Sequence, residues 1–127
     1  MINFNGNSVW NLKPIDADAV RGEVMNLLVK GETIAAAFKT IRDQLIFTNK
    51  RIISVDVQGL TGTRKSYSSL PYSKVQFFAI QTPGFGELVP DSELFLSFAN
   101  GFTAKFEFRG PVDIGALGRM ISEYVLE

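Results

Sequence analysis

Residues 44–58 read Gln44-Leu45-Ile46-Phe47-Thr48-Asn49-Lys50-Arg51-Ile52-Ile53-Ser54-Val55-Asp56-Val57-Gln58. Two runs rich in β-branched and aromatic side chains are separated here by the short polar link Asn49-Lys50. Such runs, bounded by turn residues, are typical of β-strands. Because a short link brings consecutive strands side by side in opposite directions, the stretch predicts an antiparallel hairpin of strands 44–48 and 51–58.

Five further runs of the same kind flank this hairpin. Most of the links between them are short and rich in turn residues, and one longer loop covers 82–92. Successive short links favour antiparallel neighbours. We therefore expect a mainly β domain with seven strands, at 33–40, 44–48, 51–58, 64–70, 75–81, 93–98 and 102–108.

The last two of these strands can be aligned residue by residue. A two-residue turn between them would pair Leu96 with Lys105 and force a charge into the core. A three-residue loop over 99–101, with Gly101 in the left-handed conformation, instead pairs Phe98 with Phe102. We expect this longer loop.

A helix is predicted on each side of the strands. Near the N-terminus, Pro14 suits a helix start, Gly31 suits an end, and Val20, Val24 and Leu27 share a helical spacing. The N-terminal arm and a helix of about three turns would then occupy about 1–31. A C-terminal helix is predicted over about 112–126, because its apolar residues recur three and four apart: Ile114, Leu117, Ile121, Tyr124 and Val125.

Composition narrows the function. The chain has 127 residues, which fits a single domain spanning 1–127. It contains neither Cys nor His, so thiol nucleophiles, Cys/His zinc sites and imidazole bases are excluded, and no cofactor is expected. Basic and acidic residues balance at 13 each, which disfavours a nucleic-acid partner. Without a signal peptide or an apolar run long enough to span a bilayer, the cytoplasm is the expected compartment.

One stretch resembles a nucleotide-binding motif and fails on two counts. Residues 59–66 place Gly59, Lys65 and Ser66 as in a phosphate-binding P-loop, but Arg64 occupies the position of its second glycine. The following residues also predict a strand, whereas the motif requires a helix there. A glycine turn between two strands is the better interpretation, and an enzyme is the least favoured class.

Several strands carry apolar residues on both faces. If Leu45/Phe47, Ile53/Val55, Val75/Phe77 and Leu94/Leu96 face the core, a second apolar set points away from it. Either the N-terminal helix and the long loop cover this set within one chain, or copies of the chain associate through it. The second set is the candidate self-association surface and consists of Ile46, Ile52, Phe78, Ile80 and Phe95.

Four stretches together resemble the bacterial pleckstrin-homology-like (PH-like) domain family: residues 42–43 (RD), 47–53 (FTNKRII), 56–62 (DVQGLTG) and 67–72 (YSSLPY). The resemblance implies a strongly bent seven-stranded antiparallel sheet, in two nearly orthogonal layers, closed at one end by the C-terminal helix. It also implies a cyclic homo-oligomer, commonly a pentameric ring, without enzymatic activity.

The resemblance further implies a polar surface at the junctions between protomers, where an unidentified protein partner would bind. A structural role for such turn residues is the alternative, with Asp56 capping the glycine turn and Asn49 holding its own. The positions that match the polar motif of the family are Arg42, Asp43, Lys50, Arg51, Asp56 and Gln58.

A second functional interpretation is binding of anionic lipid headgroups. Eukaryotic PH domains often bind phosphoinositides through a basic loop between their first two strands. Here that loop is short, and Lys39 and Arg42 are its basic residues. These two side chains are the candidate lipid site.

Overall fold

The protein is described here from a computed structural model, which covers residues 7–84 and 91–127. The predicted loop at 82–92 therefore lies partly outside the described residues. These residues form eight strands, two α-helices and two short 3-10 helices: β1 Asn7–Ile15, η1 Ala17–Ala19, α1 Gly22–Met25, β2 Ile34–Lys39, β3 Gln44–Thr48, β4 Arg51–Gln58, β5 Arg64–Pro71, η2 Tyr72–Lys74, β6 Val75–Gln81, β7 Asp91–Phe98, β8 Thr103–Arg109 and α2 Ile114–Val125.

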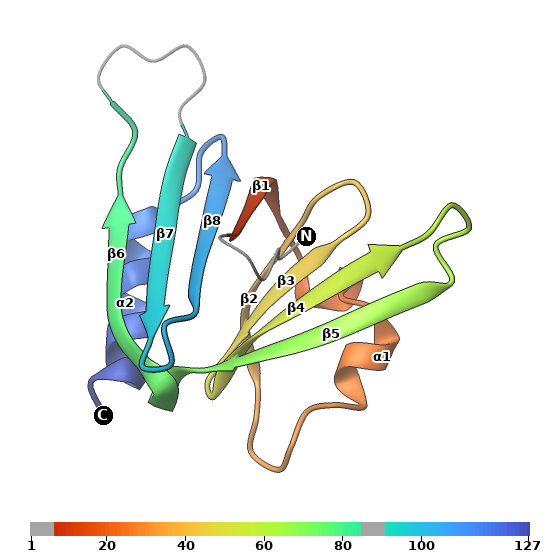
Figure 1. Ribbon diagram of the computed structural model, residues 1–127, viewed down its shortest axis with the longest axis horizontal. Helices are drawn as coiled ribbons and strands as arrows, with labels where there is room; N and C mark the ends of the chain where they lie inside the picture. Colours follow the sequence, from red (N-terminus) through yellow and green to blue (C-terminus); the bar gives the residue numbers. More distant parts are fainter. Residues whose placement is uncertain (1–6, 85–90) are drawn as a thin grey trace.

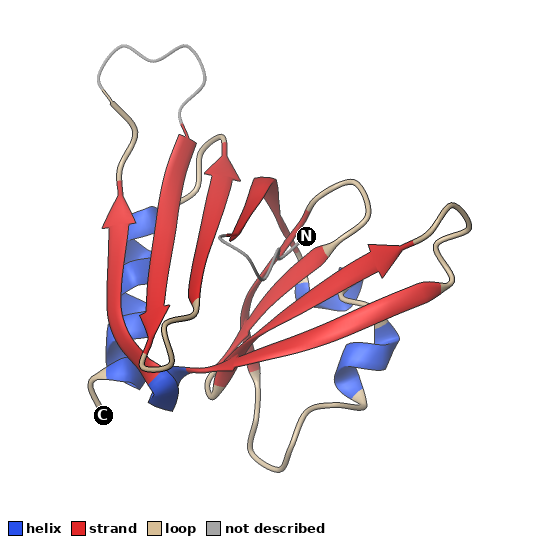
Figure 2. Ribbon diagram, viewed as in Figure 1, coloured by secondary structure: helices blue, strands red, loops and turns tan. Residues whose placement is uncertain are grey.

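The strands form one curled sheet in the order β5-β4-β3-β2-β1-β8-β7-β6. All neighbours are antiparallel except β1 and β8, which run parallel. The sheet opens into two halves: β6, β7 and β8 stand beside α2, whereas β2 to β5 fan out on the other side of β1 (Figure 1). Strands dominate the molecule, and α2 flanks one half of the sheet (Figure 2). The predicted mainly β, strongly bent fold with a C-terminal helix is confirmed.

The prediction of an N-terminal helix is wrong for most of its length. Pro14 lies in β1 opposite Phe38, and only the four residues of α1 are α-helical before Gly31. The physical reason is long-range pairing: β1 fills the gap between β2 and β8 and buries Leu12 completely. Burial and pairing there outweigh the weak local helical spacing. Val24, one of the residues on which the helix prediction was based, is nevertheless fully buried.

The hairpin of β7 and β8 has the predicted register. The backbone N–H of Phe98 donates to the carbonyl of Phe102 at 2.9 Å, and Leu96 lies opposite Ala104. Gly101 has φ of 87°, a left-handed conformation that side chains with a Cβ rarely adopt. The three-residue loop therefore keeps the apolar residues of both strands on one face.

Helix α2 is also confirmed. Its N-terminus is capped by Asp113, whose Oδ1 accepts from the backbone N–H of Ala116 at 3.0 Å. A Cβ placed on Gly118 would come within 3.1 Å of two carbon atoms of Ile80, so glycine lets α2 lie close to β6. No helix among the described residues is long and apolar enough to cross a membrane.

Two apolar clusters stabilise the sheet. The larger lies between its two halves and α2, and includes Phe47, Ile52, Leu94, Phe106 and Ile121, none of which is exposed. The smaller lies on the other face of β2 to β4, where the segment following β1 covers it with two valines. It consists of Val20, Val24, Ala37, Ile46, Ile53 and Val55.

Candidate functional site

The six residues predicted to form one polar surface lie at two ends of the same strand. Arg51 begins β4 opposite Pro71, and Gln58 ends it opposite Arg64. A strand of this length spans about 23 Å, given a rise of about 3.3 Å per residue. Lys50 and Arg51 therefore lie far from the other four residues, and the structure does not bring the six together.

At the first end, Arg51 holds the segment before β2 against the sheet. Its Nε donates to Oε2 of Glu32 at 2.9 Å, and its Nη2 donates to Oε1 of the same carboxylate at 3.0 Å. Nη2 also donates to the carbonyl of Leu27 at 2.6 Å, and Nη1 to Oγ of Ser69 at 3.0 Å. The Glu32 side chain is fully buried. Arg51 is thus engaged within its own chain, whereas Lys50 is exposed.

The pKa of Glu32 reports this engagement. Burial raises the pKa of the carboxyl, but hydrogen bonds from Arg51, Thr48 and the backbone of Val29, together with the charge of Arg51, outweigh burial and hold it below its ordinary value. Thr48 donates to Oε2 at 2.6 Å, and Val29 donates to Oε1 at 3.0 Å. Glu32 is therefore ionised and paired at neutral pH.

At the second end, two neighbouring residues fasten the β2–β3 loop to the end of β4. The Nη2 of Arg42 donates to the carbonyl of Gly59. Oδ1 of Asp43 accepts from the backbone N–H of Val57 at 2.9 Å. The predicted polar residues of this end thus lie together, and the side chain of Arg42 is exposed.

Asp56 is the most buried of the predicted polar residues at this end, with 8% of its surface exposed. Its Oδ2 accepts from Nε2 of Gln58 at 3.1 Å, whereas its Oδ1 is buried and has no hydrogen-bond partner among the described residues. A buried carboxylate oxygen without a donor is costly, because the energy of its hydration has been lost. Because this oxygen has almost no accessible surface, the part of the pair that another molecule can contact is the half-buried side chain of Gln58.

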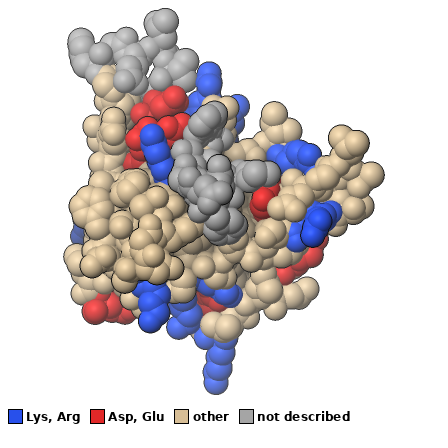
Figure 3. All heavy atoms as spheres, in the orientation of Figure 1, with Lys and Arg blue, Asp and Glu red and all other residues tan. Residues whose placement is uncertain are grey.

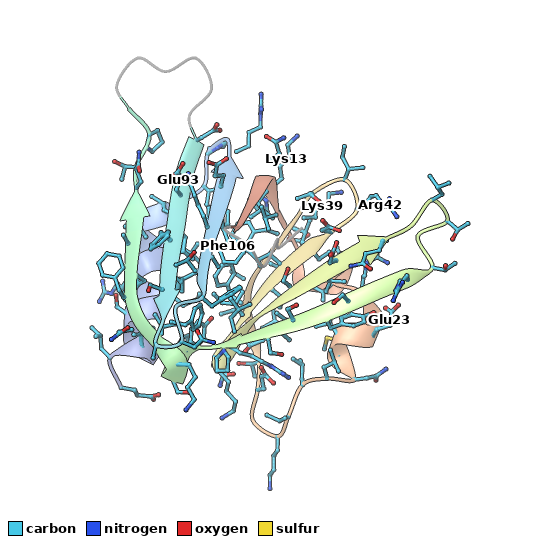
Figure 4. All side chains as sticks on the ribbon, in the orientation of Figure 1. Lys13, Glu23, Lys39, Arg42, Glu93 and Phe106 are labelled. Carbon is cyan, nitrogen blue, oxygen red and sulfur yellow. The ribbon has the colours of Figure 1, made fainter. Side chains whose placement is uncertain are left out.

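A groove beside this end contains the two candidate lipid-binding residues. Lys39 and Arg42 line it together with Lys13 and Arg109, and its volume is about 810 Å³. Lys13, Lys39 and Arg42 lie at the same end of the molecule (Figure 4). Sequence reasoning missed Lys13 and Arg109, because no local pattern joins residues so far apart in the chain. In the part of the chain that the structure describes, acidic side chains form no group that could hold a metal ion.

Two of the five candidate self-association residues are covered within their own chain. Ile46 and Ile52 have no exposed surface. Ile46 belongs to the smaller apolar cluster beneath Val20 and Val24, so for this residue the interpretation of coverage by the N-terminal segment is confirmed. Ile52 faces the larger cluster, opposite Phe47 on β3, and the prediction that it points away from the core is wrong.

The other three residues lie on β6 and β7, where one assignment of faces also needs correction. The register of β6 shifts between Val75 and Phe77, so these two residues do not share a face. Phe78 and Ile80 therefore face the core side, opposite Leu96 and Leu94, although 38% of Ile80 is exposed. The outer face carries Phe77, Ala79 and the half-buried Phe95.

Comparison with known proteins identifies a family model and relatives that match this chain. The model of the family described as Bacterial PH domain matches residues 3–125. The uncharacterized protein YjqA of Bacillus subtilis (strain 168) is 40% identical over 91 residues, which cover 72% of this chain and 71% of that protein.

Two crystal structures resemble the fold. A DUF1696 family protein with a pleckstrin-homology domain from Shewanella loihica PV-4 is 30% identical, with a TM-score of 0.78, over 92% of this chain and 99% of the other. A pleckstrin homology domain from Shewanella amazonensis SB2B is 31% identical, with a TM-score of 0.66, over 89% and 90% of the two chains. Both family-level and structural matches span nearly all of the chain. The chain therefore belongs to the bacterial PH domain family.

Proposed function

We propose that this protein is a non-enzymatic binding module whose copies associate through β6 into a closed ring and present a repeated polar surface to a protein partner. The observation that carries the proposal is an apolar face on an edge strand. β6 ends the sheet on one side, and most of its residues are exposed. Soluble monomers rarely expose such an edge, because it offers unpaired backbone groups and apolar side chains to another chain.

The apolar side chains on this edge are large. Phe77 is 55% exposed, and its ring lies 6.1 Å from that of Phe95 on the neighbouring strand. Ala79 lies directly opposite Phe95 and is also exposed. The surface over the lower part of β6 and β7 is a broad region without charged side chains (Figure 3). Covering this region with a second copy would remove apolar surface from water.

The open sheet has a second edge at β5. If β6 of one copy meets a different surface, such as β5, of the next, the contact is head-to-tail and can close into a ring. The resemblance to PH-like proteins implies five copies, and five chains of 14.1 kDa have a mass of about 70 kDa. A ring would repeat each weak site several times and strengthen overall binding by about 100-fold or more when the geometry permits.

The polar surface assigned to the partner is smaller than the sequence predicted. It comprises Arg42, Asp43, Asp56 and Gln58, since Arg51 is engaged by Glu32 and Lys50 lies at the other end of β4. Support for this surface comes from the exposed side chain of Arg42, which lies at the same end of β4 as the half-buried Gln58.

Light scattering coupled to size-exclusion chromatography tests the assembly. The wild-type protein is expected near 70 kDa (five copies of 14.1 kDa), and Phe77→Ser/Phe95→Ser is expected at the mass of one chain. Leu60→Ser is the matched control, because Leu60 is fully exposed on a turn away from β6. A wild-type protein that stays monomeric at tens of micromolar, as judged against this mass scale, contradicts the proposal.

Recovery of partners by immobilised protein tests the polar surface separately. Arg42→Gln is expected to lose partners that wild type retains, whereas Lys50→Gln, which removes the same charge from an exposed position at the other end, is expected to keep them. Equal recovery by both variants would remove the surface around Arg42 from the proposal while leaving the assembly untouched.

A further inference from the structure

We propose that a cavity between the end of β5 and the β7–β8 loop binds a small ligand that has an apolar body and a carboxylate group. The inference goes beyond self-association and beyond the polar surface at Arg42, and it depends on neither. It rests on a cavity of about 500 Å³ whose walls are apolar and whose polar side chains can all donate hydrogen bonds.

The cavity lies where two parts of the curled sheet approach each other without pairing. β5 and β6 are at opposite ends of the strand order, and the chain passes from one to the other through η2. The β7–β8 loop lies close to this passage at the lower end of the molecule (Figure 1). Val75, the first residue of β6, pairs with Phe98, the last residue of β7. The loop that follows Phe98 therefore faces the end of β5 across the cavity.

Apolar side chains form the walls. Leu70 at the end of β5 and Phe98 are buried members of the larger apolar cluster, so the core holds these two walls in place. The ring of the half-buried Phe102 lies 5.7 Å from that of Phe98, at an angle of 52°. The volume of about 500 Å³ is within the range of about 300–1,000 Å³ found for ligand sites. Burial of an apolar ligand against these rings would remove its surface from water.

The three polar side chains that line the cavity all have hydrogen-bond donors available. Asn100 uses its Oδ1 to accept from the backbone N–H of Phe102 at 3.1 Å, and its Nδ2 donates to no other described residue. Oγ of Ser69 accepts from Nη1 of Arg51 at 3.0 Å, which leaves the hydroxyl hydrogen for another acceptor. The ammonium group of Lys74 can only donate, and it forms no ion pair with another described residue.

This set of donors favours a ligand group with one negative charge. Among the described residues that line the cavity, none is acidic and one, Lys74, is cationic. A carboxylate has one charge and two acceptor oxygens, which match one ammonium group and two neutral donors. A cationic ligand would be repelled by Lys74 and would offer no acceptor to the donors. The apolar walls then require the carboxylate to belong to a molecule with an apolar body.

Saturation-transfer difference NMR with phenylbutyrate tests the cavity. This measurement detects a small ligand on a protein of any oligomeric state. Two matched probes separate the contributions: butyrate keeps the carboxylate without the ring, and phenylbutanamide keeps the ring without the charge. We expect phenylbutyrate to bind wild type at least about 10-fold more tightly than butyrate, because the ring is buried. It should bind about 3- to 5-fold more tightly than the amide, because only the carboxylate attracts Lys74.

A pair of lysine variants locates the carboxylate. Lys74→Gln should weaken phenylbutyrate binding about 3- to 5-fold and leave the binding of the amide unchanged. Lys39→Gln is the matched control, because it removes the same charge from an exposed residue at the β2–β3 loop, away from the cavity. This control should leave the affinity for both probes unchanged.

A third variant tests the apolar wall. Phe102→Ala removes a ring that lines the cavity and should weaken phenylbutyrate and phenylbutanamide alike, by about 5-fold or more, with little change for butyrate. Circular dichroism establishes that this variant is folded, and the lysine pair tests the site independently of it.

Three results would overturn the proposal. Equal affinity of wild type for phenylbutyrate and butyrate would exclude the apolar walls from the site. Equal affinity of the Lys74→Gln and Lys39→Gln variants for phenylbutyrate would exclude the carboxylate contact. Failure of phenylbutyrate at millimolar concentration to bind either wild type or Phe77→Ser/Phe95→Ser would remove the site altogether. Because the last variant is expected to be monomeric, this outcome is distinct from failure of the ring, which the mass alone decides.

Discussion

The Arg51 end of β4 and the cationic groove beside the other end of this strand use the same kinds of side chain in opposite ways. At the Arg51 end, the guanidinium meets a fully buried carboxylate, a backbone carbonyl and a hydroxyl within its own chain. In the groove, Lys13 and Lys39 lie opposite each other without an ion pair to another described residue. A charge satisfied internally holds the fold, whereas like charges placed opposite each other without an ion pair among the described residues repel.

Breaking the internal pair gives the largest expected effect. Arg51→Met leaves the buried Glu32 carboxylate without its cation, and we expect a loss of about 3 kcal/mol in the free energy of unfolding, as for other broken buried pairs. Lys50→Met, next in sequence but exposed, should change stability by no more than about 0.5 kcal/mol. Urea unfolding measures both variants, and equal midpoints would contradict a structural role for Arg51.

Acid should weaken the same end of the molecule. Because the folded pKa of Glu32 lies below its ordinary value, its contribution is complete above the unfolded pKa of about 4.3 and is lost as the pH falls through the lower folded pKa. The stability advantage of wild type over Glu32→Gln should therefore shrink on acidification below about pH 4. Thermal unfolding at a series of pH values checks this. A constant difference down to the acid limit would show that Glu32 does not titrate as inferred.

Arg42 sharpens the comparison, because it lies at the groove yet makes one internal bond. Arg42→Ala removes the donor to the Gly59 carbonyl. We expect the free energy of unfolding to fall by about 1 kcal/mol, the contribution of an ordinary hydrogen bond, because the freed carbonyl can bind water. Faster amide hydrogen exchange near the turn after β4 should accompany the loss. Lys39→Ala is the control and should leave exchange at that turn unchanged. Equal exchange at that turn in both variants would show that the bond from Arg42 does not hold it.

The smallest expected changes in the free energy of unfolding have opposite signs at two lysines of the same sheet. Lys39→Gln relieves repulsion from Lys13 and should stabilise the protein by a few tenths of a kcal/mol, within the range for cross-strand pairs. Lys105→Gln removes contacts with Glu93 and Glu107 and should destabilise it by a similar small amount. Both differences should diminish at high salt. Two shifts of the same sign would show that cross-strand charge does not govern these positions.

Local patterns in the sequence were sufficient for seven strands, the β7–β8 register and α2. Each depends on neighbours along the chain: alternation with period two, a glycine at the turn, and apolar spacing of three and four. Strands β3, β4 and β6 begin and end at the predicted residues. The face assignment failed on β6, where the irregularity between Val75 and Phe77 changes which residues alternate.

The N-terminal strand and the groove could not be read from local patterns. β1 becomes a strand through its pairing with β2 and β8, and the bond between Asn11 and Arg109 joins residues 98 positions apart. The same holds for Arg51, whose partner Glu32 lies 19 positions away and carries no distinguishing motif. The sequence correctly identified Arg42, Asp43, Asp56 and Gln58 as residues that lie together. It did not show that the length of β4 separates them from Lys50 and Arg51.

The sequence by itself determined that this chain is a mainly β domain with a C-terminal helix, that it lacks thiol and imidazole chemistry, and that it resembles bacterial PH domains. Tertiary structure alone decided which cations meet a carboxylate inside the molecule and which lie opposite another cation on a neighbouring strand. The physical reason is that secondary structure follows the spacing of neighbouring residues, whereas electrostatic pairing depends on which distant strands the curled sheet brings into contact.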